Sequence, residues 1–236
     1  MGNRTGQLKE NDKNPFAMFK ELIETIQERA PEGFVELSKY GWYLGYDGLP
    51  RTPIELGYKL RMGHENEVNK FLEEYYEEQL GNIENRLFSR NPKRKGILKE
   101  GFDNHRKGDY FSSITLLLTQ ADGLCYDKAK KFYFQNNNRL KRDKIYKPAI
   151  EEEIIEESFM FLKEYLAPMN HTAPINESMD NMENFPVRFN RHEIIHGVDL
   201  EYGTKINSLK TISFLNYLND VLHLSNGVTS NELPNK

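Results

Sequence analysis

Apolar residues recur at helical spacing in six stretches of the chain, at residues 15–31, 66–88, 97–105, 110–134, 151–166 and 204–224. In the second of these, apolar positions follow one face while Glu73, Glu74, Glu77 and Glu78 follow the other, which is typical of a solvated helix face. The stretch at 110–134 is apolar on nearly all sides, so we expect it to be the central helix. The pattern predicts an all-α protein.

Several helix ends carry recognisable signals. Asn14 before Pro15, Asp109 after Lys107-Gly108, and Thr204 are suitable N-terminal caps. A glycine-rich aromatic turn is expected at residues 41–50. Residues 167–185 show no clear period, and a connection of this length is expected to be either disordered or functional, for example a lid over a site.

Turn and charge signals divide the chain into parts. Residues 1–14 are polar and predicted to be disordered, and residues 226–236 are predicted to be a flexible tail. A boundary is expected near Pro92, between an N-terminal helical subdomain at 15–92 and a helical bundle at 93–225.

Composition limits the classes of function. The net charge of −4 gives no global attraction to nucleic acid, so any RNA contact must come from a local patch. The single Cys125 excludes an intramolecular disulfide. The sequence contains no long apolar run and no signal-peptide layout, so we expect a cytoplasmic protein without a membrane partner.

The densest group of chemically capable side chains is the run Asn190-Arg191-His192-Glu193-Ile194-Ile195-His196. A guanidinium can bind phosphate oxygens, and an imidazole can carry a proton near neutral pH. Arg191 and His196, with four residues between them, are therefore candidate catalytic residues for phosphodiester chemistry. On a regular helix they would project roughly 140° apart, so they converge only at a helix end or across a two-fold axis.

The same run also matches the zinc-peptidase pattern H-E-x-x-H, with His192 and His196 as ligands and Glu193 as general base. A third zinc ligand is not evident, although Asp199, Glu201, Asp220 and His223 follow. Glu193 also stands three residues after Asn190, which is a capping-box arrangement with a purely structural role. Zinc peptidase activity, and a helical module that binds without catalysis, remain alternatives.

The run Asn190-Arg191-His192, then Ile195-His196-Gly197 and Tyr202-Gly203-Thr204, resembles the HEPN domains, a family of small all-helical ribonucleases. The similarity extends upstream through Tyr110, Leu116-Leu117-Leu118, Gln120, Asp122 and Gly123. This resemblance implies a HEPN-like helical bundle and metal-independent RNA cleavage by Arg191 and His196 without a cofactor. It further implies a homodimer with these residues near its axis, a toxin or phage-defence role, and a possible antitoxin partner.

Other residues are candidates for supporting this chemistry. His192 is expected to orient the phosphate or supply a second proton. Asn190 and Tyr202 are expected either to hold substrate or to cap and pack within the protein. Gln120 and Asp122 are polar residues inside an apolar helix and are expected to line the site. The segment 128–147 combines basic and aromatic residues, a composition that suits an RNA groove. Its candidate RNA contacts are Lys130, Lys131, Arg139, Lys141 and Arg142.

Overall fold

The computed structural model describes residues 14–48, 51–135, 148 and 162–225. Within these ranges the regular elements are all helical and no strand occurs, so the all-α prediction is confirmed there. The main helices are α1 (Pro15–Lys39), α2 (Thr52–Arg61), α3 (Glu65–Arg90), α4 (Lys95–Arg106), α5 (Tyr110–Ala129), α6 (Leu162–Tyr165), α7 (Arg191–Ile195) and α8 (Lys205–Ser225). Short 3-10 turns connect them: η1 (Pro92–Arg94), η4 (Ala167–Asn170), η5 (Pro174–Asn176) and η6 (Met179–Asn184).

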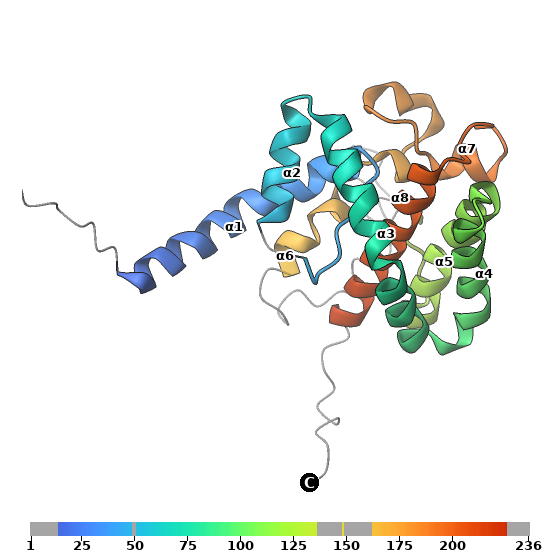
Figure 1. Ribbon diagram of the computed structural model, residues 1–236, viewed down its shortest axis with the longest axis horizontal. Helices are drawn as coiled ribbons and strands as arrows, with labels where there is room; N and C mark the ends of the chain where they lie inside the picture. Colours follow the sequence, from blue (N-terminus) through green and yellow to red (C-terminus); the bar gives the residue numbers. More distant parts are fainter. Residues whose placement is uncertain (1–13, 49–50, 136–147, 149–161, 226–236) are drawn as a thin grey trace, which may run out of the picture.

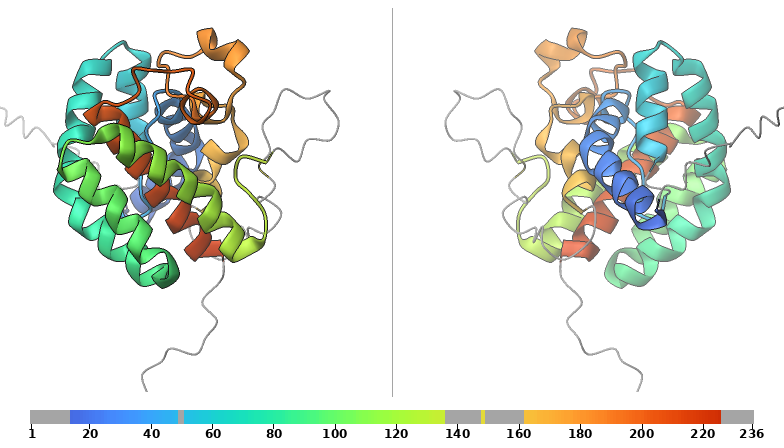
Figure 2. Two further views of the ribbon diagram at one scale, coloured as in Figure 1. Left: turned by 90° about the vertical axis from the view of Figure 1, so that its right-hand side faces the viewer. Right: turned by 90° about the vertical axis from the view of Figure 1, so that its left-hand side faces the viewer.

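The central helix is α8, which lies between α3 and α5 (Figures 1 and 2). Every residue from 208 to 222 is buried, whereas α5 keeps one face exposed at residues such as Phe111 and Thr119. The prediction that 110–134 forms the central helix was therefore wrong. The polar residues of α8 suggested that one of its faces is exposed. In the structure these residues are buried, and several of them bond to residues of other elements.

Two of those partners are arginines of α3. Arg90 Nη1 lies 2.6 Å from Asp220 Oδ1, and Arg86 Nη2 donates to Asn216 Oδ1 at 3.2 Å. The backbone N–H of Tyr46 also donates to Asp220, at 3.1 Å. Buried polar groups are tolerated when they are hydrogen-bonded in this way, so this network joins the first half of the chain to α8.

Helix α1 continues through Pro31 to Lys39, beyond the end predicted from the proline. Beyond Pro31, α1 packs closely on α2, a helix that the apolar pattern did not predict. The two backbones touch at Gly33 and Gly57, where a Cβ on Gly57 would lie 2.6 Å from the Cα of Gly33. Burial against α2 offsets the hydrogen bond that the proline removes.

Helices α3, α4 and α5 follow the predicted order and are close to the predicted lengths. Asp109 caps α5, because its Oδ1 accepts a hydrogen bond from the N–H of Ser112 at 3.2 Å, and Gly108 has the positive φ of 78° expected of a turn. Helix α5 ends at Ala129 rather than at 134, since Lys130 adopts the left-handed conformation with φ 56°. Residues 130–135 leave the helix and return toward α5 and α7.

The segment 167–185 is packed into the protein. Met169, Ala173 and Ile175 are buried in the core, so in the described structure this segment is not an open lid.

Residues on both sides of Pro92 contribute to one hydrophobic core, which extends from Leu37 to Leu222. Most of the tails predicted at 1–14 and 226–236, and most of the helix predicted at 151–166, lie outside the described residues. No helix in the described part of the chain is long and apolar enough to cross a membrane.

Candidate functional site

Helix α7 places the run from Arg191 to His196 close to the start of α8 (Figure 1). Its N-terminal cap is Asn190, whose Oδ1 accepts a hydrogen bond from the N–H of Glu193 at 3.0 Å. Its end is a Schellman motif, in which Val198 N–H donates to Glu193 O and Gly197 N–H to Ile194 O. Gly197 has φ 71°, as this ending requires. The helix is therefore limited to a little more than one turn.

Asn190 is fully buried, and its amide group bonds within the chain. Nδ2 donates to the carbonyls of Pro174 and Glu177 at 2.8 and 2.9 Å. With an exposed fraction of 0%, Asn190 has no surface that a substrate can reach. Of the two roles expected for Asn190, these contacts favour the structural one: it fixes the start of α7 against the segment that precedes it.

Glu193 is also committed to a structural contact. Its carboxylate accepts two hydrogen bonds from Arg188, from Nε at 2.8 Å and from Nη2 at 2.6 Å. Glu193 is 1% exposed, whereas the Arg188 side chain remains largely exposed. The capping prediction is confirmed for Asn190 and the N–H of Glu193, but the Glu193 side chain reaches Arg188. Such a bidentate pair neutralises the carboxylate.

His192 and His196 lie together on another face of α7. Their rings are nearly parallel, with an interplanar angle of 7° and centroids 6.1 Å apart. Burial lowers the pKa of His192 from its ordinary value, and the charges of Arg191 and His196 lower it further. His196 is exposed, so the pair combines one partly buried imidazole, whose charged form is disfavoured, with one that solvent reaches freely.

Arg191 projects from the first turn of α7 toward α5. Its guanidinium carbon lies 4.5 Å from the centre of the Phe134 ring, and Nη2 lies 3.7 Å from Asp122 Oδ2. Asp122 Oδ1 accepts a hydrogen bond from the N–H of Phe134 at 3.0 Å, so one carboxylate positions both the ring and the guanidinium. The Arg191 side chain keeps 26% of its surface exposed, which leaves it accessible to an anion. Asp122, a candidate site-lining residue from the sequence, thus lies beside Arg191.

Gln120 and Tyr202 make other contacts. Gln120 accepts a hydrogen bond from Arg94 Nη1 at 2.9 Å and is 4% exposed, so it belongs to an Arg94 contact and not to the surroundings of Arg191. The Tyr202 hydroxyl lies 2.9 Å from Thr115 Oγ1, and its ring packs edge-on against Phe111. These contacts fasten the loop after α7 to α5, and they account for Tyr202 without a substrate.

The start of the basic segment forms an exposed aromatic surface. The rings of Tyr126 and Phe132 stack with centroids 5.2 Å apart, and they are 44% and 41% exposed. Lys130 Nζ lies 5.0 Å from the centre of the Tyr126 ring. Tyr133, by contrast, is buried in the core. Lys131 is also among the described residues, whereas Arg139, Lys141 and Arg142 lie outside them.

Two residues of this site were missed by sequence reasoning. Arg188 lies before the motif and matches no sequence motif. It nevertheless forms an ion pair with the buried Glu193, five residues further along the chain. Phe134 was counted within a helix, and only the left-handed turn at Lys130 brings its ring beneath Arg191. Tertiary packing determines both contacts.

Comparison with known proteins identifies no relative: no protein-family model, curated protein or solved structure matches this chain. Among the described residues, no group of three or more His, Cys, Asp or Glu side chains is arranged to hold a metal ion.

Proposed function

We propose that the protein is an RNA endonuclease that cleaves without a metal, using Arg191, His192 and His196. One observation carries the proposal: two nearly parallel imidazoles with centroids 6.1 Å apart and a partly exposed guanidinium are presented by the same short helix and its C-terminal cap. RNA cleavage through its own 2′-hydroxyl needs a base, an acid and positive charge at the phosphate. These three side chains supply all of them.

The lowered pKa of His192 supports different tasks for the two imidazoles. Because burial and the neighbouring charges favour its neutral form, His192 is the base that takes the proton of the 2′-hydroxyl. His196, whose ring is exposed, is the acid that protonates the departing 5′-oxygen. Arg191 binds the non-bridging phosphate oxygens, held in place by Asp122 and Phe134. The product is a cyclic phosphate.

An adjacent surface suits the bases of a single-stranded substrate. The exposed stack of Tyr126 and Phe132 offers an aromatic face on which a base can pack, and Lys130 adds a positive charge beside it. Phe134, two residues after Phe132, contacts Arg191. A strand whose phosphate lies at Arg191 therefore has a stacking surface within a short stretch of the same chain.

The zinc peptidase hypothesis has less support. It requires Glu193 to activate a water between His192 and His196, yet the Glu193 carboxylate is 1% exposed and accepts two hydrogen bonds from Arg188. With both oxygens engaged by the guanidinium, this carboxylate is not positioned to take a proton from such a water. The pairing favours a structural role for Glu193 and leaves the imidazoles to act on a phosphodiester.

A homodimer around the site is part of the proposal. Ile195 at the end of α7 and Val198 and Leu200 in the loop after it are 37%, 54% and 77% exposed. A cluster of exposed apolar side chains beside polar catalytic groups is typical of an interface between subunits. The two-fold arrangement would bring a second Arg191 and His196 toward the same phosphate. A growth-arresting or phage-defence role in the cytoplasm, restrained by an antitoxin, is the biological setting that we propose for such an enzyme.

The test is RNA cleavage in the presence of EDTA. The purified chain should cut single-stranded RNA to products with a cyclic phosphate end. Arg191→Ala and His196→Ala should each reduce the rate by about 100-fold or more, because each removes a group that acts in the transition state. His192→Ala should have a comparable effect through loss of the base.

His64→Ala is the matched control, because this imidazole is exposed and lies at the start of α3, outside the site. Cleavage that persists unchanged in both Arg191→Ala and His196→Ala would exclude the proposed mechanism. Near-stoichiometric zinc that is lost in His192→Ala would favour the peptidase instead.

A further inference from the structure

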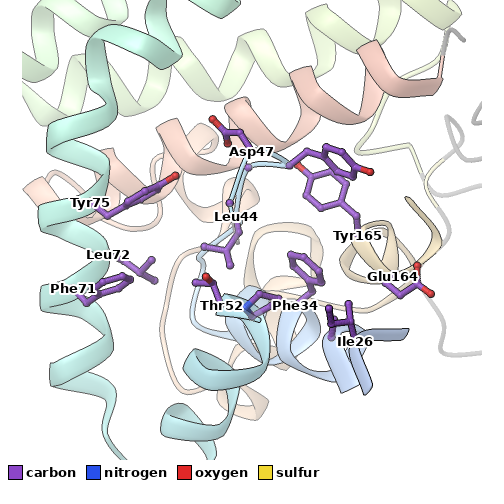
Figure 3. Close-up of a pocket in the computed structure, with 15 residues that line it drawn as sticks. Ile26, Phe34, Leu44, Asp47, Thr52, Phe71, Leu72, Tyr75, Glu164 and Tyr165 are labelled. Carbon is purple, nitrogen blue, oxygen red and sulfur yellow. The ribbon is translucent and has the colours of Figure 1, made fainter. Parts of the chain in front are cut away.

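A pocket of about 380 Å³ lies between α1, α2, α3 and α6, and its lining includes no residue of α7. Figure 3 shows Phe71, Leu72 and Tyr75 of α3 on one side, Glu164 and Tyr165 of α6 on the other, and Ile26 and Phe34 of α1 below. The lining is mostly apolar, and a pocket of this size accommodates a small organic molecule.

Aromatic rings form much of the wall. Phe34 packs edge-on against Tyr165 with ring centroids 5.6 Å apart, and Tyr46 does so at 5.3 Å. Phe71 is 48% exposed although it lies on a helix that is otherwise packed through its apolar residues. Aromatic faces attract both apolar groups and cations.

The charge at this pocket is negative. Two carboxylates, Asp47 and Glu164, line it, and no Lys or Arg is among the described lining residues. Asp47 forms an ion pair with Arg86, so its charge is compensated. Glu164 is 8% exposed and has neither an ion pair nor a hydrogen bond with any other described residue. A carboxylate buried to this extent is costly unless a cation accompanies it.

The phenol of Tyr46, another lining residue, responds to the carboxylate of Glu164. The charge of Glu164, after burial, raises the pKa of Tyr46, which is consistent with negative potential in this region.

We propose that this pocket binds an organic cation with an apolar body, such as an arylalkyl amine. The ammonium group pairs with Glu164, while the apolar part lies against Ile26 and Phe34, which Figure 3 shows nearest to this carboxylate. This assignment gives the buried carboxylate a counter-charge and fills the apolar space beside it. It is independent of the proposed RNA cleavage at α7.

Binding is tested by calorimetry on the purified full chain with three matched probes: phenylbutylamine, phenylbutanol and phenylbutyrate. The amine should bind about tenfold more tightly than the alcohol, which fills the same space without the charge. The carboxylate should bind least. Glu164→Gln should remove the preference for the amine, and Glu32→Gln, on the exposed face of α1, should keep it.

Thr52→Phe, which places a ring at the start of α2 in the pocket, should weaken all three probes. Equal affinity for amine and alcohol, or an amine preference that survives in Glu164→Gln, would overturn the proposal. It would also fail if the folded wild-type chain bound no probe.

The exposed Phe16 and Phe19 of α1 continue the apolar side of the helix that lines the pocket at Ile26 and Ala30. A different result would indicate that a second copy of the chain occupies the pocket. In that case the wild-type chain would be a dimer that binds no amine, and Phe16→Ser would both dissociate the dimer and restore amine binding.

Discussion

Arg191 owes its position to residues that themselves take no part in the proposed chemistry. Within seven consecutive residues, Asn190 and Glu193 are buried and bond to protein groups, whereas Arg191, His192 and His196 retain exposed surface. The buried pair fixes the short helix, and Asp122 with Phe134 fixes the guanidinium. A helix of this length would not be stable without such contacts.

The pKa of His192 provides a direct test of this arrangement. Burial is the main cause of its lowering below the ordinary 6.5, and the charge of Arg191 contributes. Arg191→Gln should therefore raise the midpoint of the His192 imidazole titration followed by NMR. Replacing the remote Arg29 with Gln should leave the midpoint unchanged. If Arg191→Gln left the midpoint where it was, the guanidinium would not be close to the imidazole in solution.

The same shift predicts how RNA cleavage depends on pH. A base with a lowered pKa stays deprotonated at lower pH, so the acid limb of the rate profile should have its midpoint below 6.5. This limb is measured from the initial rate of RNA cleavage in EDTA across a pH series. A midpoint well above 6.5 would assign the base to a different group.

Lys210 on α8 is the second residue whose environment gives a testable shift. It is 3% exposed, its Nζ lies 5.7 Å from the centre of the Trp42 ring, and burial lowers its pKa from 10.5 to about 8. Between these values the unfolded state binds more protons than the folded state, so the free energy of unfolding should rise with pH from about 8 to 10.5. Below pH 8 the cost of the buried charge, on the order of 3 kcal/mol, is fully present.

Lys210→Met should accordingly stabilise the protein by about 1–3 kcal/mol at neutral pH, because it keeps the aliphatic packing and removes the charge. It should also abolish the rise in stability above pH 8. Urea unfolding at neutral and alkaline pH measures both effects. Lys70→Met, at an exposed position of α3, is the control and should change neither.

At the scale of elements, the crossing of α1 and α2 decides how the first part of the chain packs. The sequence predicted that Pro31 ends the helix, but the close approach at Gly33 stabilises the turns that follow. Glycine permits this approach because a Cβ at Gly33 would lie 2.1 Å from the carbonyl oxygen of Pro53. Backbone atoms cannot move aside as a flexible side chain can.

Gly33→Ala should therefore destabilise the protein by about 1–3 kcal/mol, even though alanine is the better helix former. Gly81→Ala in α3 is the matched substitution, since nothing lies within 4 Å of a Cβ there. It should stabilise by about 0.5–1 kcal/mol. Thermal and urea unfolding measure the free energy of unfolding of each variant against the wild type. If both substitutions stabilised the protein, α1 and α2 would not approach each other this closely.

At the scale of the whole molecule, the exposed apolar loop after α7 predicts self-association. Leu200→Asp with Val198→Asp should weaken the dimer by at least tenfold in dissociation constant, because each places a charge in an apolar interface. Sedimentation velocity over a concentration series measures this change. Met62→Asp, at an exposed apolar residue of the turn after α2, is the control and should leave association unaltered. A wild-type chain that stayed monomeric at high concentration would contradict the two-fold site.

The sequence by itself determined the class of fold and singled out the short helix on which we propose the chemistry. Helical periodicity identified α1, α3, α4, α5 and α8, because an amphipathic helix records its buried face in the spacing of its apolar residues. The caps at Asn190 and Asp109 were also predictable, since a cap bonds to its own neighbours in the chain.

Tertiary structure alone decided what lies beside each candidate residue. The burial of α8 on all sides depends on Arg86 and Arg90, more than a hundred residues away, because distant partners satisfy its polar side chains. The contacts of Arg191 with Phe134 and Asp122, and the unpaired Glu164 at the pocket, likewise depend on helices that meet only after folding. Local spacing cannot encode such contacts, since they arise from the packing of elements that are remote in the chain.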